Sequence, residues 1–308
     1  MEHPYEVELN FSNICTASCI ICSRPHGCGN KPFMDSGIFY TLLTQLKDID
    51  FKIIQTSGNG EAFLNPNYLD YVSVLKREFP KIPRWTYNNF SLWNRERAER
   101  IVSENLFDKI HVRIDSLEKW VFERNSSLNQ EIVFNNLKYF LSINKKIPVV
   151  ILYNNINDYY NRCKSIIGKR PARDFFTDEE LSTIKDEEKA ILKYFKKDSA
   201  SPLIAISIGH SLWGERLHAP KDTMSKCPKW NVINKVTWIS PDGSVIACCY
   251  DDRQDFFVCG NITKEHLLSI YNGEKRKEFL KGINERKYTE YPCTNPRCCS
   301  MGDEVEIK

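Results

Sequence analysis

Short apolar segments alternate with helical segments in the first half of the chain, and this alternation limits the possible folds more than any other feature. The expected strands are 5–11, 51–56, 84–87, 109–115 and 147–152, and the expected helices are 35–49, 67–78, 94–105 and 131–144. A further strand, 203–208, is expected to return to the same sheet. This order predicts parallel β/α units of an α/β protein, with functional residues at the carboxyl ends of the strands.

A different pattern begins near residue 220. The turn signal Pro241-Asp242-Gly243 precedes a short strand at 244–247, so this part predicts a β-hairpin, followed by a helix at 263–281. A hairpin is not a β/α unit, and we therefore place a domain boundary here. The expected domains are residues 1–220 and residues 221–308.

The charges of the chain are nearly balanced, with 43 basic and 40 acidic residues and a net charge of +3. Nucleic acid and membranes are therefore not expected partners, because anionic surfaces are bound through clustered positive charge. No apolar run approaches the roughly 20 residues of a membrane-spanning helix, and the first residues lack a signal-peptide pattern, so a cytoplasmic location is expected. The polar stretch 155–200 contains one expected helix, 177–197, interpreted as an insertion or a solvated helix.

The twelve cysteines lie mainly in two groups, one near each end of the sequence. In a reducing compartment, a chain so rich in thiols binds metal more often than it forms disulfides. The first group contains Cys15, Cys19 and Cys22, whose spacing lets three thiolates surround one face of an iron–sulfur cubane. A [4Fe–4S] cluster usually takes four cysteines, so three leave one iron open to a substrate or cofactor. Zinc is the alternative, although structural zinc sites use paired C-x2-C groups or C-x2-C with H-x3-H.

This C-x3-C-x2-C loop after a first strand resembles the signature of the radical S-adenosylmethionine (SAM) superfamily. Three later segments resemble other landmarks of that family in the same order: Ser57–Ala62 its Gly-Gly-Glu-Pro motif, Thr86–Asn89 its third-strand segment and Val112–Ser116 its fourth-strand segment. Two positions depart from the Gly-Gly-Glu-Pro motif, since Asn59 replaces a glycine and Ala62 replaces the proline.

The resemblance implies a partial (β/α)6 TIM-like barrel that holds a [4Fe–4S] cluster on Cys15, Cys19 and Cys22. It also implies that SAM binds at Asn59, Gly60, Glu61, Asn88, Arg113 and Asp115. The segment that resembles the Gly-Gly-Glu-Pro motif would hold the amino group of SAM. Relatives cleave SAM by reduction to a 5′-deoxyadenosyl radical, which removes hydrogen from an unactivated C–H bond. A small electron donor, a flavodoxin or ferredoxin, is then the expected protein partner.

The second group of cysteines resembles the SPASM or twitch extension of radical SAM enzymes, which binds auxiliary [4Fe–4S] clusters. By position, Cys227, Cys248, Cys293 and Cys298 (or Cys299) match its ligands. Two auxiliary clusters would need eight thiols and this part has seven, so one auxiliary cluster is expected. A structural zinc site formed by the same cysteines is the alternative.

Cys249 directly follows an expected ligand, and relatives place this position near the substrate. We expect it to be a catalytic hydrogen-atom donor, which would make the reaction an epimerisation. The alternatives are a packing thiol or another cluster ligand.

The substrate stays open at this level. The resemblance implies a peptide or natural-product substrate and an epimerisation, an oxidation or a cross-link. The alternatives are a sugar or aminocyclitol dehydrogenase or epimerase in antibiotic biosynthesis, and a non-catalytic zinc-binding adaptor. The short segment before the first strand argues against a leader-peptide-binding domain, which many peptide-modifying relatives carry.

Overall fold

The computed structural model describes most of the chain, in nine ranges. These are residues 1–20, 22, 31–162, 164, 175–197, 199–200, 204–208, 233–248 and 257–285. Among the cysteines of expected function, Cys15, Cys19, Cys22 and Cys248 fall in these ranges. Cys227, Cys249, Cys293, Cys298 and Cys299 lie outside the described residues.

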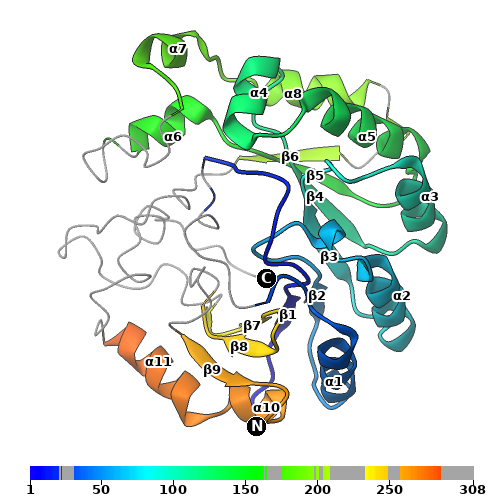
Figure 1. Cartoon of the computed structure of the whole chain (residues 1–308), viewed down its shortest axis with the longest axis vertical. Coiled ribbons are helices and arrows are strands. Elements are labelled where there is room, and N and C mark those ends of the chain that lie inside the picture. Colours follow the sequence, from blue (N-terminus) through cyan, green and yellow to red (C-terminus); the bar gives the residue numbers. More distant parts are fainter. Residues whose placement is uncertain are drawn as a thin grey trace.

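The described strands form one nine-stranded sheet, in the order β6-β5-β4-β3-β2-β1-β7-β8-β9. Its strands are β1 (Glu6–Leu9), β2 (Ile53–Gln55), β3 (Arg84–Asn88), β4 (Lys109–Arg113), β5 (Val149–Tyr153), β6 (Ile204–Ile208), β7 (Val236–Ile239), β8 (Ser244–Ile246) and β9 (Val258–Asn261). The first seven strands are parallel to their neighbours, and β7-β8-β9 are antiparallel. The sheet curves but does not close, so the expected six-stranded partial barrel is confirmed (Figure 1).

Helices follow the strands and cover the outer face of the curved sheet, as α1, α2, α3 and α5 do in Figure 1. The described helices are α1 (Ser36–Leu46), η2 (Ala62–Leu64), α2 (Tyr68–Glu78), α3 (Arg95–Glu104), α4 (Lys119–Ser126), α5 (Gln130–Ile143), α6 (Ile156–Arg162), α7 (Asp178–Thr183), α8 (Glu188–Lys196), α10 (Leu267–Tyr271) and α11 (Glu274–Asn284). Asp35 caps α1 as its sequence suggested, because its Oδ1 accepts a hydrogen bond from Ile38 N at 2.9 Å.

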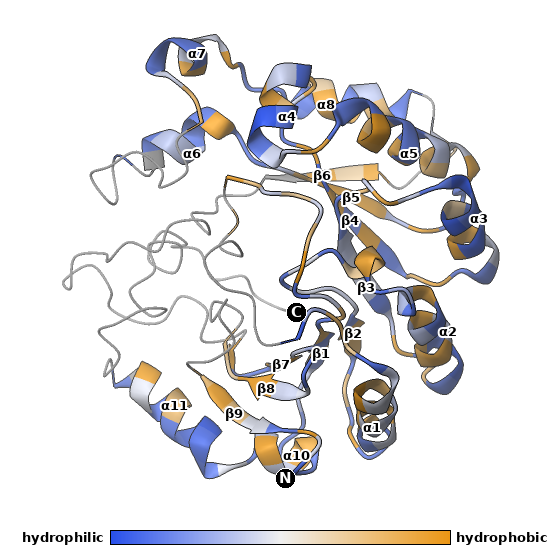
Figure 2. Cartoon of the chain, viewed as in Figure 1, coloured by the Kyte–Doolittle hydropathy of each residue, from blue (hydrophilic) through white to orange (hydrophobic). Residues whose placement is uncertain are grey.

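The hydrophobic core lies between these helices and the sheet. Strand residues such as Val7, Leu9, Ile110 and Val112 are fully buried there, packed in one cluster with apolar residues of α1, α2, α3 and α5. Figure 2 shows the matching orange stripes on the strands and on the inner sides of the helices. Because successive strand residues point to opposite faces, the alternate residues of β1, β3 and β4 face the inside of the barrel.

The C-terminal hairpin extends the same sheet and does not form a separate one. Strand β7 lies parallel to β1, and Asn10 N donates to Ile239 O at 2.9 Å. On the other side, Gln45 of α1 joins this unit through Nε2 to Ile262 O (2.9 Å) and through Oε1, which accepts from Leu267 N (2.7 Å). The barrel and the hairpin are therefore held together by a continuous ladder and by a side-chain link from α1.

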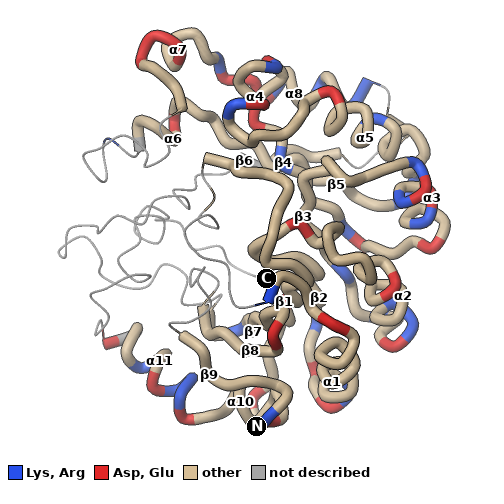
Figure 3. Tube along the Cα trace, viewed as in Figure 1, with Lys and Arg blue, Asp and Glu red and all other residues tan. Residues whose placement is uncertain are grey.

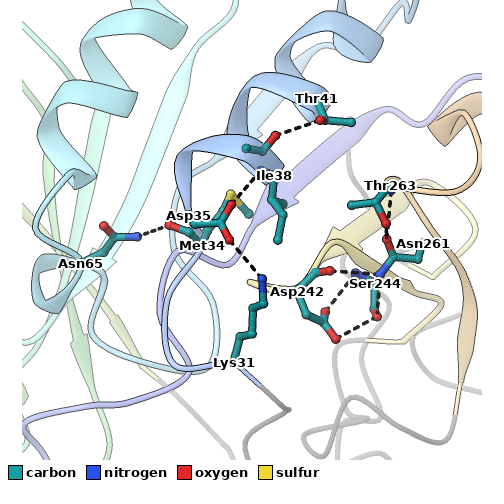
Figure 4. Close-up of polar contacts among 11 residues, drawn as sticks. Lys31, Met34, Asp35, Ile38, Thr41, Asn65, Asp242, Ser244, Asn261 and Thr263 are labelled. Atoms are coloured by element: carbon teal, nitrogen blue, oxygen red, sulfur yellow. Dashed lines mark hydrogen bonds and ion pairs between the residues drawn. The ribbon is translucent and has the colours of Figure 1, made fainter.

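The turn of the hairpin is held by a polar network around Asn261, shown in Figure 4. Asn261 Nδ2 donates to Asp242 O at 3.0 Å, and its Oδ1 accepts from Thr263 N at 2.9 Å. The carboxylate of Asp242 accepts from Ser244 N and Ser244 Oγ at 3.0 and 3.1 Å. Gly243 has a φ of +84°, in the region that favours glycine, which explains the Asp-Gly pair of this turn. Asn261 is joined to the same turn through its hydrogen bond to Asp242 O.

Two expected helices differ from the structure. The single helix expected at 177–197 is divided into α7 and α8, because Glu187 at the break is bound from two sides: its Oε2 accepts from Leu117 N at 2.9 Å, and its backbone N donates to Tyr153 Oη at 3.0 Å. The helix expected at 263–281 is likewise two helices, α10 and α11, separated at Asn272 and Gly273. Asn272 exchanges hydrogen bonds of 2.9 Å with the backbone of Glu2, which docks the first residues of the chain.

Charged residues of both signs are interspersed along the outer helices, for example on α3 in Figure 3. No helix in the described ranges is both long and apolar enough to cross a membrane.

Candidate functional site at the ends of strands β1 to β5

The cysteine loop lies at the carboxyl end of β1, where the first helix of the barrel has not yet begun. Cys15, Cys19 and Cys22 are half-buried, and none of them forms a disulfide. The end of α4 fixes this loop through two backbone hydrogen bonds: Ser18 N donates to Ser126 O at 2.8 Å, and Ile20 N donates to Asn125 O at 3.0 Å. Three thiols are thus presented from a backbone that is itself anchored.

The loop after β2 lies directly beneath the cysteine loop. A Cβ atom added to Gly60 would stand 2.2 Å from Ser12 O and 2.4 Å from Ile14 O, closer than any side chain tolerates. Glu61 N donates to Ile14 O at 2.8 Å, one residue before Cys15. Glycine is therefore required at position 60 because two backbones meet there.

The side chain of Glu61 points into the protein and not toward the open end of the barrel. It is 2% exposed and accepts from Asn88 Nδ2 (2.6 Å), Phe63 N (3.1 Å) and Asn89 N (3.2 Å). Burial raises the pKa of this carboxyl to about 7, although the three hydrogen bonds act in the opposite direction. Glu61 and Asn88 therefore join the loops after β2 and β3.

The loop after β3 reaches the cysteine loop through Asn89. Its Nδ2 donates to Thr16 Oγ1 at 3.0 Å and lies 3.6 Å from Cys15 Sγ, which also accepts from Ala17 N at 3.4 Å. Ser91 adds a second link, with its Oγ 2.7 Å from Thr16 Oγ1. Asn89 was not among the expected site residues, although its neighbour Asn88 was.

Arg113 and Asp115 form an ion pair at the carboxyl end of β4, with Nε and Oδ2 2.5 Å apart. Asp115 also accepts from Asn125 Nδ2 at 2.6 Å and from Asn154 N at 3.2 Å, so the ends of β4, α4 and β5 converge on it. Burial lowers the pKa of the Arg113 guanidinium, but the negative charges of Asp115, Cys19 and Cys22 outweigh this, and the pKa is raised. Arg113 therefore lies close to two of the three cysteines.

The structure thus brings the expected N-terminal site residues to one end of the barrel: Cys15, Cys19, Cys22, Asn59, Gly60, Glu61, Asn88, Arg113 and Asp115. Asn125 and Asn154 also belong to this region, and sequence patterns did not indicate them because each is brought there by its helix or strand. Within the described ranges, no group of three or more His, Cys, Asp and Glu side chains is arranged to hold a single metal ion.

The inside of the barrel is polar. Glu8, Gln55, Trp85 and Lys109 stand in register across β1 to β4. Trp238 Nε1 of β7 donates to Glu8 Oε2 at 2.7 Å, so the hairpin also contributes to this interior.

Tyr87 and His111 lie two residues further along β3 and β4 than Trp85 and Lys109. Their rings form a stacked pair, with centroids 4.2 Å apart. Burial and the charges of Glu8 and Glu6 raise the pKa of the Tyr87 phenol. Burial and Lys109 lower the pKa of His111 to about 4, so this imidazole is neutral at pH 7. Among the described atoms, its Nδ1 has no hydrogen-bond partner.

In the C-terminal unit, Cys248 lies two residues beyond the end of β8 and is 4% exposed, and Cys259 lies in β9 and is 8% exposed. Neither forms a disulfide. Strand β8 ends at Ile246, so the alternation of side chains along it does not extend to Cys248.

Comparison with known proteins agrees with this arrangement. Residues 227–299 match the SPASM family, an iron–sulfur cluster-binding domain. The fold is similar to those of three solved structures: anSMEcpe with bound AdoMet (TM-score 0.61, 15% identity, 91% of this chain and 80% of that one), Streptococcus suis SuiB bound to precursor peptide SuiA (0.57, 14%, 90% and 66%), and BtrN in complex with AdoMet and 2-DOIA (0.51, 14%, 97% and 93%). No curated protein matches by sequence.

This chain therefore has the fold of the radical SAM enzymes. It carries a SPASM domain at residues 227–299, which confirms the resemblance seen in the sequence.

Proposed function

We propose that the chain is an enzyme that cleaves SAM by reduction and removes hydrogen from an unactivated C–H bond of a peptide or natural-product substrate. The observation that carries this proposal is the anchored loop that presents three thiols at the carboxyl ends of the parallel strands. A [4Fe–4S] cluster bound there would supply the electron, and SAM would supply the radical that attacks the substrate. A small electron-transfer protein, a flavodoxin or ferredoxin, would reduce the cluster.

The residues of the chain would bind and orient these groups. Cys15, Cys19 and Cys22 would hold the cluster, and Asn59, Gly60 and Glu61 would hold the amino end of SAM. Asp115 already holds Arg113 at 2.5 Å, so the guanidinium is fixed at the carboxyl end of β4. The stacked pair Tyr87 and His111 would form one wall of a substrate site inside the barrel.

One auxiliary [4Fe–4S] cluster is proposed for the C-terminal unit, on Cys227, Cys248, Cys293 and Cys298. Cys249 is proposed as the hydrogen-atom donor of an epimerisation. In that case deuterium would enter the product from D2O, because thiol hydrogens exchange with solvent, and the Cys249→Ala variant would keep its iron but lose this incorporation.

A small polar substrate is the second candidate. BtrN, one of the solved structures of similar fold, is in complex with AdoMet and 2-DOIA. The polar barrel interior suits a sugar or aminocyclitol, because its hydroxyl and amino groups would pair with Glu8 and Lys109.

Iron content and SAM cleavage test the proposal. The anaerobically reconstituted protein should hold about eight irons, four in each cubane. Replacing Cys15, Cys19 and Cys22 together by alanine should halve the iron and abolish 5′-deoxyadenosine formation. Cys28→Ala, in the same group of cysteines, is the matched control and should change neither. Full iron and full product in the triple variant, or a colourless zinc protein in place of an iron protein, would contradict the proposal.

A further inference from the structure

The side chain of Asn89 reaches a thiol of the cysteine loop from outside that loop. Its Nδ2 lies 3.6 Å from Cys15 Sγ, beside the 3.4 Å contact from Ala17 N. The two donors approach the same sulfur, one from within the loop and one from the loop after β3. Sulfur accepts longer hydrogen bonds than oxygen does, and both distances are within its range.

The orientation of the Asn89 amide is defined by its other contacts. Oδ1 accepts from Ser91 N at 2.9 Å, so the nitrogen must be the atom that faces the cysteine loop. The backbone of Asn89 is held in turn, because its N donates to Glu61 Oε2 at 3.2 Å. Glu61 is buried and also binds Asn88 Nδ2 at 2.6 Å, which fixes the whole loop after β3. The donor is therefore preorganised.

We propose that Asn89 is a positioning residue that tunes the reduction potential of the SAM-binding cluster through an N–H···S hydrogen bond to Cys15. This inference rests on the proposed function, which places that cluster on Cys15. One electron from the external donor adds negative charge to the cluster, and part of this charge resides on the ligand sulfurs. A hydrogen-bond donor to such a sulfur stabilises the reduced form more than the oxidised form, because the sulfur is then more negative. The residues that surround metal ligands commonly tune a metal centre in this way.

The experiment is a redox titration followed by electron paramagnetic resonance on the intact reconstituted protein, with the SAM-binding cluster identified as the signal that changes when SAM is added. Asn89→Leu removes the donor without adding charge. Asn89→Asp removes the donor, keeps an oxygen for Ser91 N and adds a negative charge. Ser91→Ala is the matched control, because Ser91 links the same two loops through Thr16 but does not contact the sulfur.

We expect the midpoint potential to become more negative in the order wild type, Asn89→Leu, Asn89→Asp, with Ser91→Ala close to wild type. At a fixed solution potential, the ratio of reduced to oxidised cluster in Asn89→Leu should fall by roughly threefold to tenfold, as expected for the loss of one hydrogen bond of ordinary net strength. Unchanged midpoints in the Asn89 variants, a shift equal to that of Ser91→Ala, or failure of both Asn89 variants to load iron would overturn the inference. If wild-type protein has no SAM-sensitive iron–sulfur signal, the proposed function itself fails.

Discussion

At the scale of single residues, the site depends on a short path of contacts that runs across three loops. Gly60 lies against the backbone before Cys15, Glu61 reaches from the same loop to Asn88 and Asn89, and Asn89 returns to Cys15. Each step joins residues that are distant in sequence. The position of the cysteine loop therefore depends on residues other than its cysteines.

The substitution Gly60→Ala should destabilise the protein by about 2–4 kcal/mol, because its Cβ would overlap two backbone oxygens that cannot rotate away. Anaerobic urea unfolding of the intact protein measures this. Gly37→Ala is the matched control: Gly37 lies in α1, and the nearest atom to its added Cβ is Asp35 Oδ1 at 3.4 Å. That change should be neutral or stabilise by up to about 1 kcal/mol. Equal unfolding midpoints for the two variants would contradict the close packing of the loops.

At the scale of secondary-structure elements, the hairpin β7–β8 and strand β9 depend on the polar network of Asn261. Its side-chain amide binds Asp242 O on one side of the turn and Thr263 N on the other. The next residues lead to α10, which Gln45 joins to α1. The network therefore positions Cys248, which follows β8, relative to the barrel.

Asn261→Ala should cost about 1–3 kcal/mol of stability, because Asp242 O and Thr263 N would lose their partners. Hydrogen exchange followed by mass spectrometry should show faster exchange in peptides covering residues 240–248, with α2 and α3 unchanged. Lys264→Ala, an exposed neighbour, serves as the control and should leave exchange as in wild type. Exchange that increases equally across the whole barrel would show that Asn261 is not specific to the hairpin.

At the scale of the whole molecule, the partial barrel keeps ionisable side chains on its inner face. Glu6 is one of them, and burial raises its pKa from 4.5 to about 7. A raised carboxyl pKa means that the folded chain binds this proton more tightly than the unfolded chain does. The free energy of unfolding must then fall as pH rises from about 4.5 to about 7, and the full cost is present above pH 7.

Glu6→Gln removes this titration. The variant should be more stable than wild type at pH 8 by up to about 3 kcal/mol, and the advantage should shrink steadily toward pH 5. Anaerobic urea unfolding between pH 5 and pH 8 measures the difference. Glu2→Gln is the control, because Glu2 is exposed and near the same end of the chain. A Glu6→Gln advantage that does not change with pH would show that packing, and not ionisation, causes it.

The sequence by itself determined the parts of this protein that depend on local patterns. The alternation of strands and helices predicted the six parallel strands, and the cysteine spacing with the turn at Asp242 and Gly243 predicted the two cysteine-bearing units. Both signals repeat within a few residues along the chain, so no knowledge of distant contacts is needed to recognise them.

Only the tertiary structure decided what distant residues do to one another. The side chain of Glu61 is held inward by Phe63 N of its own loop and by Asn88 Nδ2 and Asn89 N, which lie 27 and 28 positions away. The helix at 177–197 is broken because Glu187 binds Leu117 and Tyr153, which lie far away in sequence. The contact of Asn89 with Cys15 joins residues 74 positions apart. Such contacts depend on how the loops pack at the ends of parallel strands, and local sequence periodicity does not predict that packing.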